Sequence, residues 1–157
     1  MSPIRDQLLK TATAYLDAHT NRDVEALRGL YSPSCKHENY PKPIQPIFPN
    51  VGHEEYFVAA VDIIKMWESF DIHQFADPVV DEEARKVVVF VEGTGKADVG
   101  TYVNEYIVVL KMDNEGKLVE ERLQFFDSKG LLDWVALLGQ RAQEIHQKAM
   151  NSKKADE

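Results

Sequence analysis

The first third of the chain carries apolar side chains at the spacing of amphipathic helices. Ser2 and Pro3 predict a helix start, because a capping residue stands before a proline in the first turn. The apolar positions that follow share one helical face: Ile4, Leu8, Ala12 and Tyr15. Similar spacing predicts a second, shorter helix that is capped by Asn21, and a third helix from His53 to about Trp67.

Between the second and third helices the pattern turns polar. Residues 35–41 read CKHENYP and predict a short strand that ends at Pro41. The segment 41–49 holds four of the seven prolines. Proline lacks a backbone N–H and restricts φ, so this density excludes regular helix and sheet. We expect the segment to form a flap that serves as a lid.

Near residue 70 the spacing changes to strand-like runs rich in Val, Ile, Phe and Tyr. Four strands are predicted, at 71–80, 87–94, 102–112 and 118–127. Their connections are short and rich in turn residues, so we expect an antiparallel meander. Asp127 and Ser128 predict the start of a last helix, and the residues from 140 to 157 form a polar tail that can extend it.

This order of elements predicts an α+β fold. We expect a curved antiparallel sheet that the N-terminal helices close into a cone with an internal cavity, followed by a C-terminal helix. The length of 157 residues suits a single domain over 1–157, with its core at about 4–139.

Charge and composition narrow the possible partners. The net charge is −8 and the one basic cluster is Lys153–Lys154, so we expect no nucleic-acid partner, because phosphate binding needs a basic face. The sequence shows neither a bilayer-spanning apolar run nor a signal peptide, so we expect no membrane partner and a cytoplasmic location. The glycine-rich phosphate-binding motifs are absent too, so we expect no cofactor.

Two stretches resemble a known superfamily. Residues 100–128 read GTYVNEYIVVLKMDNEGKLVEERLQFFDS, and residues 32–37 read SPSCKH. Together with the order of elements, they resemble the NTF2-like superfamily and, within it, SnoaL-like polyketide cyclases and isomerases of fungal natural-product gene clusters. The resemblance implies a cone-shaped cavity and a small-molecule substrate. It does not fix the activity, because one fold hosts many functions.

Alternation along the strands indicates which side chains face the cavity. In the last strand we assign the more apolar set to the concave face: Val119, Glu121, Leu123, Phe125 and Asp127. Similarity to ketosteroid isomerases supports this, because their pocket aromatic residue matches Phe125. In the preceding strand the same resemblance implies an inward set of Tyr102, Asn104, Tyr106 and Val108. Glu105 then faces outward but stays a candidate through its place in the N-E-Y motif.

The short strand and the first helix add further candidates. His37 and Asn39 share one face of the strand, opposite Lys36 and Glu38. Asn39 matches the catalytic aspartate of ketosteroid isomerases, but an amide cannot act as a base. Tyr15 matches their catalytic tyrosine, a position where aromatic residues are also common in the core.

The spacing of the histidine, cysteine and acidic residues gives little support to a metal site or a nucleophilic thiol. His37, Glu38, His53 and Glu54 lie close in sequence without a full ligand pattern, so we expect no metal site. Cys35 is interpreted as a small buried apolar residue rather than a nucleophile. His53 stands beside the flap and is kept as a possible substrate contact.

General acid–base chemistry is the hypothesis that the candidates favour. An apolar pocket raises the pKa of a carboxylic acid and lowers that of histidine, which brings both towards neutrality. We predict His37 as base and Asp127 as acid, although Asp127 could equally be only a helix N-cap. Hydrogen bonds to a developing oxyanion are expected from Tyr15, Tyr106, Asn39 and Asn104. The remaining substrate-binding candidates are Glu105, Glu121, Phe125, Tyr102 and His53.

The sequence therefore predicts a cofactor-independent isomerase, cyclase or dehydratase. Its substrate would be a small hydrophobic, oxygenated intermediate derived from a polyketide or terpenoid. The alternative is a non-catalytic ligand-binding or protein-interaction domain with the same fold. The outward strand positions are also apolar, as in VVVFV at 87–91, so we expect a homodimer through the sheet.

Overall fold

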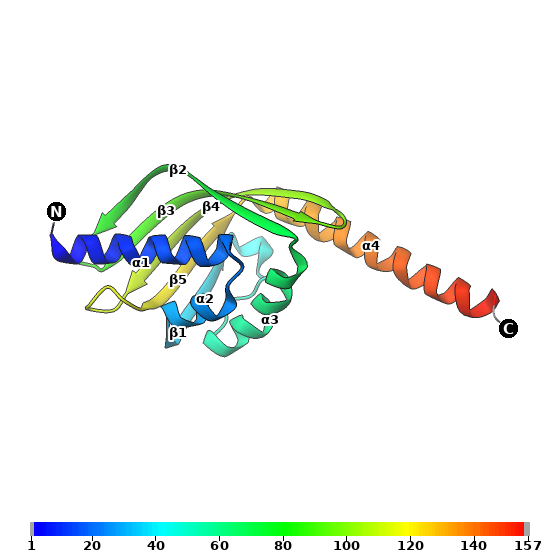
Figure 1. The fold of residues 1–157 in the computed structure, drawn as a ribbon, viewed down its shortest axis with the longest axis horizontal. Coiled ribbons are helices and arrows are strands. Elements are labelled where there is room, and N and C mark those ends of the chain that lie inside the picture. The colour runs from blue at the N-terminus through cyan, green and yellow to red at the C-terminus, as the bar shows by residue number, and fades with distance from the viewer. Residues whose placement is uncertain (1, 156–157) are drawn as a thin grey trace.

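The computed structural model describes residues 2–155, with side chains for residues 2–152. Residues 1, 156 and 157 of the predicted domain, and the side chains of Lys153 and Lys154, lie outside that part. The elements follow in the order α1 (Pro3–Thr20), α2 (Val24–Leu30), β1 (Tyr31–Tyr40), η1 (a 3₁₀ turn, Lys42–Ile44), α3 (His53–Met66), β2 (Ser69–Asp81), β3 (Lys86–Ala97), β4 (Gly100–Met112), β5 (Val119–Phe126) and α4 (Ser128–Ala155). In Figure 1, α1 crosses in front of the curved strands.

The sheet has the strand order β1-β5-β4-β3-β2. The strands β2 to β5 form the predicted antiparallel meander. β1 extends the sheet by pairing in parallel with β5, so that edge alone is not antiparallel. The predicted α+β class, with a curved sheet, N-terminal helices on its concave side and a C-terminal helix, is confirmed.

Helix starts follow the expected capping chemistry, with one correction. The side chain of Ser2 accepts a hydrogen bond from the backbone N–H of Arg5, as predicted for the start of α1. α2 is capped by Asp23, whose carboxylate accepts from the N–H of Ala26 at 2.9 Å. The prediction that Asn21 caps this helix is wrong, because Asn21 instead ends α1.

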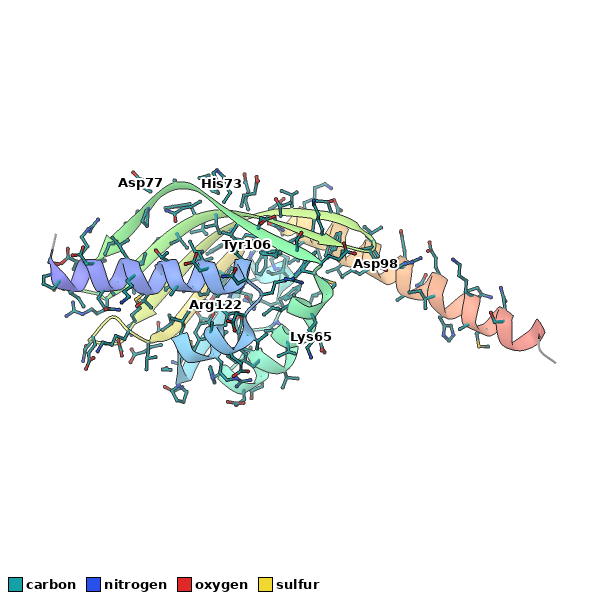
Figure 2. All side chains as sticks on the ribbon, viewed as in Figure 1. Lys65, His73, Asp77, Asp98, Tyr106 and Arg122 are labelled. Carbon is teal, nitrogen blue, oxygen red and sulfur yellow. The ribbon has the colours of Figure 1, made fainter. Side chains whose placement is uncertain are left out.

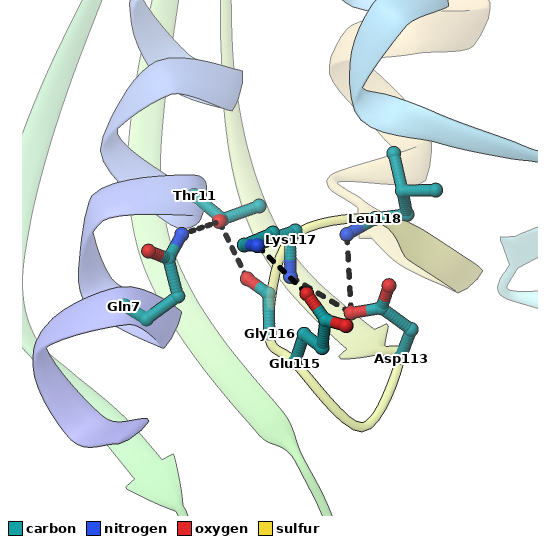
Figure 3. Close-up of polar contacts among 7 residues, drawn as sticks. All are labelled: Gln7, Thr11, Asp113, Glu115, Gly116, Lys117 and Leu118. Atoms are coloured by element: carbon teal, nitrogen blue, oxygen red, sulfur yellow. Dashed lines mark hydrogen bonds and ion pairs between the residues drawn. The ribbon is translucent and has the colours of Figure 1, made fainter. Parts of the chain in front are cut away.

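Figure 3 shows how α1 is held against the turn between β4 and β5. The hydroxyl of Thr11 donates to the carbonyl of Gly116 at 2.6 Å. The carboxylate of Asp113 accepts from the backbone N–H of Lys117 at 2.8 Å and so closes the turn. Gly116 has a φ of 72°, which a residue with a side chain rarely adopts. These contacts fix the position of the cavity-facing side of α1.

A register shift in β5 changes which of its side chains face inward. Lys111 pairs with Glu121 and Met112 pairs with Val119, so Glu120 is an extra residue on β5. Such a bulge reverses the alternation beyond it. Val119 is buried as predicted, but Arg122 and not Glu121 is the next buried side chain. The prediction that Glu121, Leu123, Phe125 and Asp127 line the concave face is therefore wrong.

Apolar side chains gather in two clusters. One lies under α1 and includes Leu8, Leu110 and Val119. The other includes Ile44, Trp67 and Trp134 and joins the proline-rich segment to α4. The proline-rich segment is thus anchored by Ile44, which is fully buried, and it contains the 3₁₀ turn η1 within otherwise irregular backbone.

α4 continues past Gly139 to Ala155, so the described part of the polar tail is helical. Figure 1 shows its C-terminal half projecting away from the body. Across residues 2–155, the structure contains no helix with the length and apolar character needed to cross a membrane.

Candidate functional site

A cavity of about 660 Å³ lies inside the cone. Its lining includes residues of both apolar clusters, for example Val108 from one and Leu131 from the other. Ile47, Phe48 and Pro49 place the proline-rich segment in the wall. The volume falls in the range of small-molecule sites, and most of the lining is apolar.

One wall of the cavity is aromatic. Trp67, which follows α3, stacks on Tyr102 of β4 at 5.5 Å and on Trp134 of α4 at 5.4 Å between ring centroids. A Cβ at Gly95 would lie 2.6 Å from the Trp67 ring, so glycine permits this close approach. We call Trp67, Tyr102 and Trp134 the aromatic wall. Tyr106 lines the cavity next to it and donates to the hydroxyl of Tyr102 at 3.0 Å.

A single arginine organises a polar region of the same cavity. Nε of Arg122 donates to Nδ1 of His37, and Nη2 donates to Oδ1 of Asn39, each at 3.2 Å. Nη1 donates to the side-chain oxygen of Gln124. We call these four residues the Arg122 cluster. Figure 2 places the labelled Arg122 and Tyr106 within the body, whereas His73 and Asp77 lie along the outer side of β2.

The positive charge of Arg122 is buried without a carboxylate partner. Its side chain is only 4% exposed, and its guanidinium stays protonated in proteins. Among residues with described side chains, none of the ion pairs involves Arg122. The guanidinium carbon lies 5.0 Å from the ring centroid of Tyr56, a cation–π contact. The acidic residues of the cavity lining are Glu55 and Asp62, both exposed on α3.

His37 is fully buried beside this charge rather than exposed to the cavity. Its ring stacks on Tyr56 at 3.9 Å. Burial, then the positive charge of Arg122 and then His53 lower the pKa of His37 to about 3. The imidazole is therefore neutral near pH 7 and accepts from Arg122 through Nδ1. It positions Arg122, and the pKa lies well below the near-neutral value that the sequence-based hypothesis assumed. A role as base stays a prediction.

Asp127 lies away from the cavity lining. Its side chain is exposed and accepts from the backbone N–H of Lys129 at 3.1 Å, at the start of α4. Two hydrogen bonds connect its backbone to the buried amide of Asn104, at 2.9 and 3.0 Å. The structure therefore places Asp127 as a helix cap and Asn104 as its support, and it does not bring Asp127 together with His37.

Of the other candidates, Tyr15, Asn39, Tyr102 and Tyr106 line the cavity, as the sequence predicted. Burial raises the pKa of Tyr15 and of Tyr102 to about 12, and the nearby Arg122 opposes this shift at Tyr15. Both phenols therefore stay protonated near pH 7. They can donate a hydrogen bond to a ligand oxygen.

Besides His37, Asp127 and Asn104, four further candidates do not line the cavity. Glu105 is exposed on the opposite face of β4. Glu121 forms an ion pair with Lys111 at 3.2 Å, and Phe125 is 44% exposed. His53 is buried at the start of α3, with its ring 5.0 Å from that of Phe57.

The sequence-based site missed Arg122, Gln124 and Tyr56. Simple alternation assigned the first two to the outer face of the last strand. The one local signal was the Glu120–Glu121 pair. Two successive charged residues in a strand cannot both face solvent without a break in alternation.

Cys35 is buried, and burial raises the pKa of its thiol to about 12. This agrees with its interpretation as a small apolar residue. In the region that the structure describes, no three or more His, Cys, Asp or Glu side chains gather as metal ligands.

Comparisons with known proteins identify relatives and structures of similar fold. No family model matches the sequence. Austinoid biosynthesis clusters protein H of Penicillium brasilianum is 37% identical over 130 residues, which cover 82% of this chain and 88% of that protein. The BvnE pinacolase of Penicillium brevicompactum superposes with a TM-score of 0.82 at 25% identity, covering 88% of this chain and 99% of that one.

A protein of Shewanella denitrificans described as a SnoaL-like polyketide cyclase matches with a TM-score of 0.68. At 14% identity, with 86% of this chain and 98% of that chain covered, it supports the fold alone. The NTF2-like, SnoaL-like fold that the sequence resembles is confirmed.

Proposed function

Because the chain belongs to the family of the fungal austinoid biosynthesis cluster proteins H, we propose that it rearranges a secondary-metabolite intermediate without a cofactor. The reaction would be of the isomerase or cyclase type, on a polyketide- or terpenoid-derived substrate. The similarity to a pinacolase supports a rearrangement of this kind.

The observation that carries the proposal is the buried charge of Arg122 within an apolar cavity. Preorganised donors in a site of low dielectric stabilise charge that develops on an oxygen atom far better than water does. Tyr15, whose phenol stays protonated, lies next to the guanidinium. An oxygen atom placed between these two groups could gain negative charge during the rearrangement and be stabilised at once.

The remaining cavity residues would orient the substrate. Trp67, Tyr102 and Trp134 offer ring faces to an apolar ring system. The proline-rich segment would cover it. That segment is tied to β1, because the amide of Asn39 donates to the carbonyl of Pro49 at 3.2 Å and His37 pairs with Val51. A lid motion would have to break these contacts.

A non-catalytic binding protein is the second candidate. Its specific support is the separation of His37 from Asp127, since a pair that does not meet at the cavity cannot relay a proton there. Both candidates bind the same class of molecule, so turnover decides between them.

The test is conversion of a genuine intermediate. Deletion of the gene in its producing organism should cause the substrate to accumulate. Purified protein should then convert that compound, without added metal or nucleotide, to a product of identical mass for an isomerase or cyclase. Loss of one water would instead indicate a dehydratase. An unchanged compound, with folded protein present, would support the binding alternative.

We also propose that the chain forms a homodimer through the convex face of the sheet. Exposed apolar side chains gather there: Phe75, Val79, Val103, Ile107 and Phe125. Exposed apolar surface of this kind is typical of protein interfaces. Light scattering at micromolar concentration should give twice the mass of the chain, and a monomer would refute the dimer. The cytoplasmic location stays a prediction.

A further inference from the structure

The Arg122 cluster holds a positive charge that the described side chains do not neutralise. All three of its hydrogen-bond acceptors, on His37, Asn39 and Gln124, are uncharged groups. Removing a charge from water costs free energy, and hydrogen bonds from neutral groups offset only part of that cost. A buried arginine of this kind is therefore ready to bind an anion.

The guanidinium is also held in one orientation. It is fixed through Nε and both Nη atoms by side chains from two neighbouring strands, β1 and β5. The Tyr56 ring lies on one side of it. A planar group with a fixed orientation favours a planar anion whose charge is shared between two oxygen atoms.

Other charges near the guanidinium are few. His19 lines the cavity, and its pKa is lowered to about 3 by burial and then by Arg122, so it is neutral near pH 7. Arg22, at the end of α1, donates to the backbone carbonyl of Trp67. Glu55 and Asp62 are exposed on α3, so their charges are screened by water. Within the described cavity lining, Arg122 is the one buried charged group.

The aromatic wall contains a buried donor that lacks a partner. Trp134 is 6% exposed, and its indole Nε1 is buried without a hydrogen-bond acceptor in the described part of the chain. A buried indole N–H normally finds a partner. A ligand with an oxygen atom at that end would supply one.

We propose that Arg122 is an anion-binding centre, and that the ligand of this cavity is an apolar multi-ring molecule with a planar acidic oxygen group. That group is an ionised carboxyl group or the enolate of a 1,3-dicarbonyl. The inference names the substrate class of the proposed function and uses that function only to place the substrate in the cavity.

The test compares affinities of the wild-type protein for two matched pairs of probes by calorimetry near pH 7. One pair is the tricyclic carboxylate abietate and its neutral methyl ester, and the other is a cyclohexane-1,3-dione that carries an aryl substituent and its neutral enol methyl ether. A charge-assisted pair should make at least one anion bind about 10- to 100-fold tighter than its own neutral counterpart. Preference for abietate alone indicates a carboxylate, and preference for the dione alone indicates an enolate. Equal or weaker binding of both anions overturns the proposal.

Two variants assign the preference to Arg122. In Arg122→Met the ratio of abietate to ester affinity should fall to about 1, because the charge is gone while the aromatic wall remains. Lys10→Met removes one exposed positive charge from α1 and should leave the ratio unchanged. Retention of the full ratio in Arg122→Met contradicts the assignment.

The measurement does not depend on turnover. If the purified protein does not convert the accumulated compound but still binds an anion tighter than its neutral counterpart, the proposed function fails and the anion site stands. If neither anion binds tighter than its neutral counterpart, the anion site fails whether or not the protein is an enzyme. Should Arg122→Met not fold, the ratio in the wild-type protein still decides whether the cavity prefers an anion, and Arg122→Gln replaces Arg122→Met in assigning that preference to Arg122.

Discussion

The Arg122 cluster and the aromatic wall line the same cavity but are built on different physical principles. The cluster holds one buried charge by directed hydrogen bonds between β1 and β5. The wall holds stacked rings from the end of α3, from β4 and from α4, with little directed bonding. The charge and the fixed hydrogen-bond directions determine which oxygen group of a ligand can bind. The area of the aromatic rings determines how strongly the apolar part of any ligand binds.

This difference means that substitutions in the two regions should have separable effects. Changes in the aromatic wall should lower stability and substrate affinity together. Changes in the Arg122 cluster should lower turnover or anion selectivity while apolar binding persists.

The largest effect is expected from Trp67→Ala in the aromatic wall. Losing a large buried ring that stacks on two others should lower the free energy of unfolding by about 3–5 kcal/mol. Urea unfolding measures this loss of stability. Ile145→Ala, at an exposed site on the projecting part of α4, is the control and should cost less than about 1 kcal/mol. A similar small loss for both would show that the wall does not stabilise the fold.

The next effect concerns turnover. Arg122→Met should lower kcat/KM by about 10²- to 10³-fold, the range for removal of one donor to a developing oxyanion. Arg122→Lys keeps the charge but loses the planar geometry, so it should also be impaired. Lys10→Met is the matched control. Activity within about twofold of wild type in Arg122→Met would remove the cluster from catalysis.

Acid should destabilise the protein through the histidines near Arg122. The pKa values of His37 and His19 are about 3 in the folded protein, below the ordinary value of 6.5. The unfolded chain therefore binds protons first. Stability present above pH 6.5 is lost as pH falls towards 3, by up to about 1.4 kcal/mol per pH unit for each histidine.

Measuring the free energy of unfolding at several pH values gives the slope of stability against pH. His37→Gln should reduce it, whereas His146→Gln, on the exposed surface of α4, should not. A slope that His37→Gln leaves unchanged would mean that His37 is not held neutral by Arg122 and burial.

The smallest effect separates two roles for Asp127. As a helix cap, Asp127→Ala should cost about 1 kcal/mol of stability and leave kcat within about threefold. Thermal unfolding and turnover of the same preparation provide both numbers. A loss of kcat near 10²-fold without a loss of stability would restore the catalytic acid that the sequence suggested.

The sequence predicted the fold well because periodicity reports burial directly. Leu8, Ala12 and Tyr15 share the buried face of α1, and the four strands appear as a meander. The inward face of β1, with His37 and Asn39, also follows from simple alternation. These features depend on local patterns that tertiary contacts reinforce.

The site was harder to predict, because one inserted residue reverses which side chains of a strand face inward. The extra Glu120 moves Arg122 inward and Phe125 outward, and strict alternation cannot anticipate a bulge. The contact between Arg122 and His37 joins residues 85 positions apart in sequence. No local pattern encodes such a distance, so the centre of the polar region emerged only from the structure.

The role of Arg122 is tested most directly by chemical rescue of the Arg122→Ala variant. Turnover should be strongly reduced in this variant, and guanidinium at concentrations below those that unfold the protein should restore part of it. Lys10→Ala should lose no activity and gain none from guanidinium. A folded Arg122→Ala variant with wild-type turnover, or one that guanidinium does not restore at all, would contradict the claim that a buried charge at this position serves the reaction.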